Sequence, residues 1–180
     1  HRRAIRERYG LKKHVVLHLG RLSAEKKVED VLRAFSLLHS RVPDASMLII
    51  GDGPDRIALQ EKAKLMKGGV SIVFTGFIRP QELLESGMLS VGDAFITASP
   101  MESQGMVVVE AMAFGLPIIG ANAGAIPEVV GDTGILFEPG DISAMANALE
   151  KVLRSEELKN QLSQKSLERS TFFSIQSATD

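Results

Sequence analysis

The sequence has 180 residues, of which 44% are hydrophobic and 24% charged, and its formal net charge is −1. These values are ordinary for one globular domain, and they argue against a disordered chain and against a broad basic surface for nucleic acid. The chain has no cysteine, which excludes disulfides and thiolate chemistry. No apolar run approaches the roughly 20 residues that span a bilayer, and the charged start lacks a signal-peptide core. The chain begins with His1 rather than Met, so we expect it to be part of a longer protein.

Short, nearly continuous apolar runs alternate along the chain with segments of helical spacing. The runs predict strands at residues 15–19, 47–50, 72–75, 94–98, 117–120 and 134–137. The spacing predicts helices at residues 28–40, 55–67, 80–90, 105–114, 141–154 and 156–169. Continuous apolar runs are typical of parallel strands covered on both faces, and strand–helix alternation implies right-handed crossovers. We therefore predict an α/β fold, a Rossmann-like doubly wound parallel sheet of about six strands with helices on both faces.

The glycines and turn residues of this pattern gather where the predicted strands end. We expect a single domain over residues 1–180, with a core at about residues 14–165 and end segments that connect to other parts of a longer protein. Ligands of doubly wound sheets sit beyond the carboxyl ends of the strands. Those ends carry Gly20-Arg21, Gly51-Asp52-Gly53, Gly76, Ser99-Pro100 and Gly120. This edge is therefore the expected binding site.

The segment after the first predicted strand carries two cations near a helix start. Gly20 permits a sharp turn, and Arg21 and Lys26 place a guanidinium and an ammonium at the edge of the sheet. A guanidinium, an ammonium and the N–H donors of a helix start together suit a diphosphate. The alternative is that both side chains are solvated surface charges.

Two glutamates eight residues apart mark a second segment. Glu102 lies in a predicted loop, and Glu110 lies about five residues into the next helix, roughly 7–8 Å along its axis from Gly105. A diphosphate at the helix start could then lie between two carboxylates that accept the paired hydroxyls of a ribose or a hexose. Gly105 would permit close approach of the backbone. The alternative is a helix-start acid at Glu102 and an exposed helix residue at Glu110, although the apolar neighbours of Glu110 favour partial burial.

These segments together resemble glycosyltransferase family 4 and its relatives of the GT-B fold. The pair Glu102-x7-Glu110 is followed by Ala-Met-Ala-x-Gly-x-Pro, as in the signature of that family. The flanking matches stand in the same order, at residues 20–26, 51–54, 73–76, 124–129 and 133–141. Each match is weak alone, but six in register over about residues 14–165 are specific. The resemblance implies the C-terminal, donor-binding lobe of a GT-B enzyme.

The resemblance implies a role for each charged residue of the site. Arg21 and Lys26 would bind the diphosphate and stabilise charge on the leaving group. Glu110 would hold the ribose hydroxyls, and Glu102 would contact hydroxyls of the transferred sugar. Glu102, Arg21 and Lys26 are therefore the expected catalytic residues.

Glycines and backbone groups complete the site that the resemblance implies. The further donor contacts would come from Gly20, Gly76, Phe77, Ile78, Gly105, Met106 and Val107, with the segment after Gly76 flanking the base. There are two departures from the family pattern, of which the first concerns the specificity for the sugar and the second the stiffness and charge of the loop after the first predicted strand. Ser103-Gln104 stand where the family often has Gly-Phe, and Lys27 stands where it often has glycine.

The function implied is retaining transfer of a hexosyl group from a UDP- or GDP-linked donor to an unidentified acceptor. No cofactor and no metal ion are expected, since two fixed cations replace a metal. An acceptor sugar or lipid would bind mainly to a missing N-terminal lobe, so the isolated chain should show little or no transfer. A cytoplasmic site is expected from the supply of nucleotide sugars, with membrane contact only in the full-length enzyme and no nucleic-acid partner. Three alternatives stay open: a lobe of a sugar-nucleotide epimerase or hydrolase, a non-catalytic nucleotide-sugar-binding module, and an α/β signalling domain.

Other polar residues are expected to have structural roles. His14 and His18 share a strand face but lie about 13 Å apart, which is too far for one metal ion, so packing or hydrogen bonding is expected. Asp52 is expected to cap the turn that follows it, and Asp93 to order the start of a strand.

Overall fold

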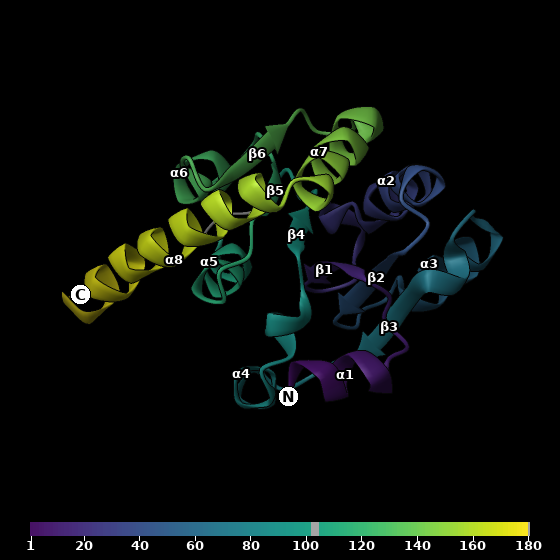
Figure 1. Cartoon of the computed structure of the whole chain (residues 1–180), viewed down its shortest axis with the longest axis horizontal. Coiled ribbons are helices and arrows are strands. Elements are labelled where there is room, and N and C mark those ends of the chain that lie inside the picture. The colour runs from purple at the N-terminus through teal and green to yellow at the C-terminus, as the bar shows by residue number, and fades with distance from the viewer. Residues whose placement is uncertain (102–104, 180) are drawn as a thin grey trace.

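A computed structural model describes residues 1–101 and 105–179 and shows a parallel six-stranded sheet between two layers of helices (Figure 1). The strands are β1 His14–Leu19, β2 Ala45–Ile50, β3 Ile72–Gly76, β4 Ala94–Thr97, β5 Ile118–Ala121 and β6 Gly134–Phe137. Their order is β3-β2-β1-β4-β5-β6, and every pairing is parallel. The predicted doubly wound fold is confirmed. The order reverses between β1 and β4, and such a point is where doubly wound sheets bind ligands.

Both faces of the central strands are buried. Val16 and Ile96 lie on one face, in the core that α2 and α7 cover. Leu17 and Phe95 lie on the other face, in the core that α5 covers. None of these four side chains is exposed to solvent. A strand buried on both faces needs apolar residues at successive positions, which is why the runs in the sequence are continuous.

Helices and short 3-10 turns connect the strands. The α-helices are α1 Arg2–Arg8, α2 Val28–Arg41, α3 Arg56–Leu65, α4 Pro80–Ser86, α5 Met106–Ala113, α6 Ile126–Val130, α7 Ile142–Arg154 and α8 Glu156–Thr179. The 3-10 helices are Ala24–Lys26, Gly69–Ser71 and Met88–Val91. The carboxylate of Asp141 accepts a 3.0 Å hydrogen bond from the N–H of Ala144 and so caps the start of α7.

Two helix predictions are wrong in extent. The helix predicted over residues 80–90 ends at Ser86, because Gly87 adopts a left-handed conformation with φ 69°, and a separate 3-10 helix follows. The helix predicted over residues 156–169 continues to Thr179 as α8. The short helix α6 was not predicted, since five residues are too few to show a helical repeat.

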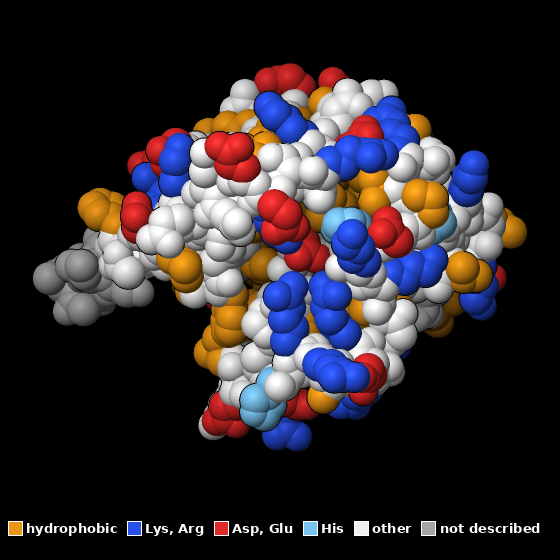
Figure 2. All heavy atoms as spheres, viewed as in Figure 1, with side chains coloured by type: hydrophobic (Ala, Val, Ile, Leu, Met, Phe, Trp, Pro, Cys, Tyr) orange, Lys and Arg blue, Asp and Glu red, His pale blue; other side chains and the backbone are white. Residues whose placement is uncertain are grey.

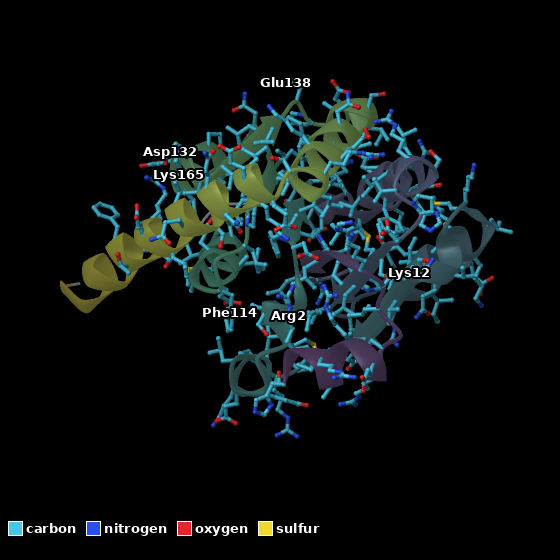
Figure 3. The ribbon with its side chains drawn as sticks, in the orientation of Figure 1. Arg2, Lys12, Phe114, Asp132, Glu138 and Lys165 are labelled. Carbon is cyan, nitrogen blue, oxygen red and sulfur yellow. The ribbon has the colours of Figure 1, made fainter. Side chains whose placement is uncertain are left out.

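The two ends of the chain form helices that contact the rest of the domain. The expected connector at residues 2–13 contains α1, and Ile5 of α1 and Tyr9, which follows the helix, pack against the core. Helix α8 runs along α5 and α7 (Figure 1), and its Lys165 points toward Asp132, at 3.7 Å (Figure 3). Among the described helices, none is both long and apolar enough to cross a membrane.

The amino-terminal edge of the sheet is fixed by the buried carboxylate of Asp93. It accepts a 2.8 Å hydrogen bond from the N–H of Val15, which orders the start of β1 as predicted. Three cations surround it: Arg6 at 3.2 Å, Lys159 at 3.3 Å and Arg2 at 3.4 Å. Lys and Arg side chains gather in the middle of the face shown in Figure 2, in the area where Figure 3 labels Arg2. This cluster ties α1 and α8 to the edge opposite the expected binding site.

Candidate active site

A cavity of about 310 Å³ opens at the carboxyl edge of the sheet. Its walls come from the loops after β1, β2 and β3 and from α4 and α5. The lining residues are Leu19, Gly20, Arg21, Ile50, Gly51, Asp52, Phe77, Ile78, Pro80, Leu83, Val107 and Glu110. The ionisable side chains among them are Arg21, Asp52 and Glu110. The structure therefore brings together the cationic loop, the residues expected near the base, and the acid of α5.

Buried Leu22 anchors the loop that carries Arg21. The Leu22 side chain is fully buried, its N–H donates to the carbonyl of Asp52 at 3.0 Å, and its carbonyl accepts from the N–H of Asp55 at 3.0 Å. The neighbouring Arg21 side chain is exposed and reaches the cavity. Backbone hydrogen bonds therefore join the loop after β1 to the turn after β2.

Gly51 permits the close approach of these two backbone segments. Its φ is 143°, and a Cβ at this position would overlap the carbonyl oxygen of Gly20. The next residue, Asp52, accepts hydrogen bonds from the N–H of Gly53 at 2.8 Å and from Arg56 at 3.1 Å. The Gly53 N–H, more than Arg56, holds the pKa of the Asp52 carboxyl below its usual range. The predicted capping role of Asp52 is confirmed, and Asp52 also lines the cavity at the strand-end edge where the sequence places the binding site.

Lys26 ends the 3-10 helix Ala24–Lys26 and does not line the cavity. Its neighbour Lys27 has φ 53° and is the positive-φ residue other than glycine in the described chain. The pKa of the Glu25 carboxyl is lowered first by the Ser23 hydroxyl, and further by the charges of Lys26 and Arg21. Both cations therefore lie close enough to Glu25 to stabilise the charge of its carboxylate.

His18 lies buried beneath this loop and has a structural role, as predicted. Its Nδ1 lies 3.0 Å from the carbonyl oxygen of Ile96, and its Nε2 has no partner among the described residues. Burial lowers the pKa of the His18 imidazole, and the charge of Lys26 lowers it further. His14 lies 3.9 Å from Asp44 instead. No group of three potential metal ligands occurs in the described residues.

Helix α5 begins at the carboxyl edge with Gly105 as its N-cap. Gly105 has φ 65°, and its carbonyl accepts from the N–H groups of Val108 and Val109, each at 3.1 Å. The N–H groups of Met106 and Val107 precede the first helical bond and have no partner within residues 1–101 and 105–179, and such groups at a helix start favour an anion. The Val107 side chain lines the cavity, whereas the Met106 side chain is exposed and points elsewhere. A contact from Met106 can therefore come only from its backbone.

Glu110 is the half-buried carboxylate of the cavity. Burial raises the pKa of its carboxyl above the usual value. No group in residues 1–101 or 105–179 forms a hydrogen bond or ion pair with it. An acid that is partly desolvated and not paired within the described chain is suited to accept hydrogen bonds from a ligand.

Several of the predicted site residues are not among the described residues that line the cavity. Glu102 lies outside the described residues, as do Ser103 and Gln104. Gly76 ends β3 beneath the guanidinium of Arg56 and does not line the cavity. The apolar lining from Leu19 and Ile50 was missed, because these residues belong to strands whose side chains are expected in the core.

A larger hollow of about 580 Å³ lies on the α2 side of the same edge. It is lined by Ser23, Lys27 and Pro100, among others, but by none of Arg21, Lys26 or Glu110. The smaller cavity is the candidate site, because it joins the guanidinium and the half-buried acid.

The fold and the cavity define a doubly wound α/β protein in which a guanidinium and a half-buried carboxylate line one cavity at the carboxyl edge of the sheet. The sequence model of the family described as "Glycosyl transferases group 1" matches residues 1–169. The chain belongs to this family.

Curated relatives are glycosyltransferases by name. The chain is 33% identical over 172 residues to a sulfoquinovosyl transferase of Arabidopsis thaliana, covering 93% of the chain and 32% of that protein. It is 33% identical over 168 residues to an N-acetyl-alpha-D-glucosaminyl L-malate synthase of Bacillus anthracis, covering 91% of the chain and 43% of that protein. The chain thus spans less than half of the length of these relatives.

Solved structures share the fold. The C-terminal domain of a glycosyl transferase group 1 family protein from Francisella tularensis has a TM-score of 0.82 and 25% identity, over 96% of this chain and 92% of that one. The Anabaena protein HepE in complex with UDP-glucose has a TM-score of 0.83 and 23% identity, over 94% of this chain and 47% of that one. At this identity the second likeness concerns the fold alone.

Proposed function

We propose that the chain is the donor-binding part of a retaining glycosyltransferase that transfers a hexosyl group from a nucleoside diphosphate sugar. The observation that carries this proposal is the cavity in which Arg21 and half-buried Glu110 face one space at the start of α5. The Anabaena structure with UDP-glucose supports a nucleotide-sugar donor. The proposed donor is a UDP- or GDP-linked sugar.

Each charged residue has a separate task in this proposal. Arg21 and Lys26 hold the diphosphate together with the first N–H groups of α5, and Glu110 accepts the ribose hydroxyls. Glu102, which lies outside the described residues, is assigned to hydroxyls of the transferred sugar. The two carboxylates then flank a diphosphate held by cations.

The reaction breaks the bond between the anomeric carbon and the diphosphate oxygen. The bonding electrons stay on the departing diphosphate, the oxygen of the acceptor hydroxyl forms the new bond on the same face of the sugar, and the hydroxyl proton passes to the departing diphosphate. Arg21, Lys26 and the helix start stabilise the charge that develops on the leaving group, and groups of this kind contribute several kcal/mol. We propose that these fixed cations act without a metal ion.

The acceptor belongs to another part of the protein in this proposal. Residues 1–180 form one donor-binding domain whose end helices connect to an N-terminal lobe, which binds an acceptor sugar or lipid. The partial coverage of the relatives supports this arrangement. Supply of nucleotide sugars favours action in the cytoplasm, and contact with a membrane belongs to the full-length enzyme.

Product analysis of the full-length protein tests this function against its rivals. With a panel of nucleotide sugars and acceptors, the proposal predicts a glycoside whose anomeric configuration by NMR matches that of the donor. An epimerase or hydrolase lobe predicts turnover of the donor without an acceptor, and a non-catalytic module predicts no turnover. The variant Glu102→Ala should lose transfer, and an unchanged rate would remove Glu102 from the proposed site.

A further inference from the structure

The wall of the cavity after β3 is apolar. Phe77, Ile78, Pro80 and Leu83 contribute it, from the segment after β3 and the start of α4. Leu83 is 3% exposed and closes the inner end. A base that enters here meets side chains that neither donate nor accept hydrogen bonds.

The backbone of Ile78 supplies the polar groups of this wall. In the described part of the chain, neither its N–H nor its C=O pairs with another protein group. Buried backbone groups are nearly always paired, so a ligand that covers Ile78 must satisfy both. The N–H and C=O of Ile78 can therefore pair with a base edge that offers one hydrogen-bond acceptor beside one donor.

Carboxylates close to this wall are directed elsewhere. Glu82 and Glu85 of α4 line a separate hollow together with Arg79. The two oxygens of Asp52 accept hydrogen bonds from its own loop and from α3. Glu110 comes from α5, and the proposed function assigns it to the ribose. No carboxylate among the described residues is therefore free to bind donor groups of a base at the apolar wall.

We infer that this cavity selects uridine nucleotides over guanosine and adenosine nucleotides, an inference that rests on the proposed function. The C=O of Ile78 accepts the N3–H of uracil, and its N–H donates to a uracil carbonyl. Guanine offers an N1–H and, in addition, an exocyclic amino group, which would be buried against Pro80 and Leu83 without an acceptor. A site that leaves such a group unpaired rejects the ligand.

Adenine is disfavoured by size rather than by hydrogen bonding. Its edge offers one acceptor and an amino group, which Ile78 can meet, but its second ring needs more room than uracil. The cavity, at about 310 Å³, lies at the small end of the range of about 300–1,000 Å³ for ligand sites. A base with one ring needs less of this space than a purine.

Calorimetric titration of the chain with UDP, GDP and ADP tests the inference. UDP should bind at least tenfold more tightly than either purine nucleotide, which corresponds to about 1.4 kcal/mol. The variant Glu110→Gln should weaken the binding of UDP, which ties the measured affinity to this cavity. GDP or ADP binding as tightly as UDP would overturn the inference while leaving the donor-site function in place. Failure of all three to saturate at millimolar concentration would count against the donor site itself, and therefore against both.

An added carboxylate gives a second test. Pro80 is exposed, lines the cavity and is the first residue of α4, where an acidic residue is tolerated by the helix dipole. Pro80→Asp should supply the acceptor that guanine lacks and reduce the preference for UDP over GDP at least fivefold. Glu82→Gln, which changes a carboxylate of α4 outside the cavity, should leave the preference unchanged. An unaltered preference in Pro80→Asp would overturn the assignment of this wall to the base.

Discussion

Gly105 lies against Val129, and a Cβ on Gly105 would crowd the valine side chain. A Cβ on Gly105 would lie 3.0 Å from the Cγ2 atom of Val129, closer than packed carbon atoms ordinarily approach. The contact joins the start of α5 to α6, so Gly105 is required for packing as well as for its φ of 65°. The sequence predicts that Gly105 lets a ligand approach the backbone, and the structure adds two reasons for a glycine there, the contact with Val129 and the positive φ.

Gly105→Ala should therefore destabilise the fold by about 2–4 kcal/mol, the sum of left-handed strain and overpacking. Urea denaturation measures the effect. Gly10→Ala is the matched control, because Gly10 has φ 62° and nothing lies within 4 Å of its Cβ position. The control should cost about 1 kcal/mol, from strain alone. Equal losses in the two variants would show that the contact with Val129 carries no energy.

Glu110→Gln should change stability and binding in opposite directions. Because burial raises the pKa of the Glu110 carboxyl, the stability of the free chain falls as pH rises from the usual pKa of a glutamate to the raised one. The variant removes this loss, so it should be the more stable protein at neutral pH, and the difference should vanish in acid. Nucleotide binding should weaken about tenfold, or about 1.4 kcal/mol, since the amide replaces a charged acceptor. Weaker stability of the variant at neutral pH would contradict this account.

Lys27→Gly tests the strain in the cationic loop. Lys27 has φ 53°, which costs a non-glycine residue about 1–2 kcal/mol, whereas glycine costs about 0.5–1 kcal/mol in backbone entropy. The variant should be as stable as the parent or up to about 1 kcal/mol more stable in urea denaturation. Lys27→Ala keeps the strain and removes the charge, so it separates the two effects. A decrease in the free energy of unfolding greater than about 1 kcal/mol in Lys27→Gly would show that the lysine side chain stabilises the loop.

Asp93→Asn should destabilise the fold by about 2 kcal/mol, because the buried charge that pairs with Arg6 and Lys159 is lost. Thermal unfolding at two salt concentrations measures this loss and its electrostatic part. Arg3→Gln is the control, since the Arg3 side chain is 92% exposed and pairs only with Glu7 in the described chain. The control should change stability by less than about 0.5 kcal/mol. A neutral effect of Asp93→Asn would mean that α1 and α8 are held by apolar packing alone.

The sequence predicts the sheet well because its strands are buried on both faces. The run at residues 134–137 has the bounds of β6, and the other runs agree with their strands to within two residues. Helix ends were less predictable, because the end of α4 depends on the left-handed conformation of Gly87, and glycine is compatible with several conformations. The short helix α6 contains Pro127 and has too few residues for a period to appear.

The site was predicted where charge and glycine mark it, and missed where it is apolar. Arg21 and Glu110 stand out in the sequence, and the structure places both at one cavity. Leu19 and Ile50 do not stand out, because the last residues of buried strands look the same whether they face the core or a ligand. Only the three-dimensional arrangement of strand ends shows which side chains a nucleotide would meet.

The central claim is that the cavity between the loop after β1 and helix α5 binds the nucleotide of the donor. Titration of the isotope-labelled chain with UDP, followed through backbone amide shifts, tests it most directly. The account predicts saturable shifts at Gly20, Arg21, Val107 and Glu110, with little change at Val15 on the opposite edge. Shifts confined to the larger hollow beside α2, or no saturable shifts at millimolar UDP, would contradict it.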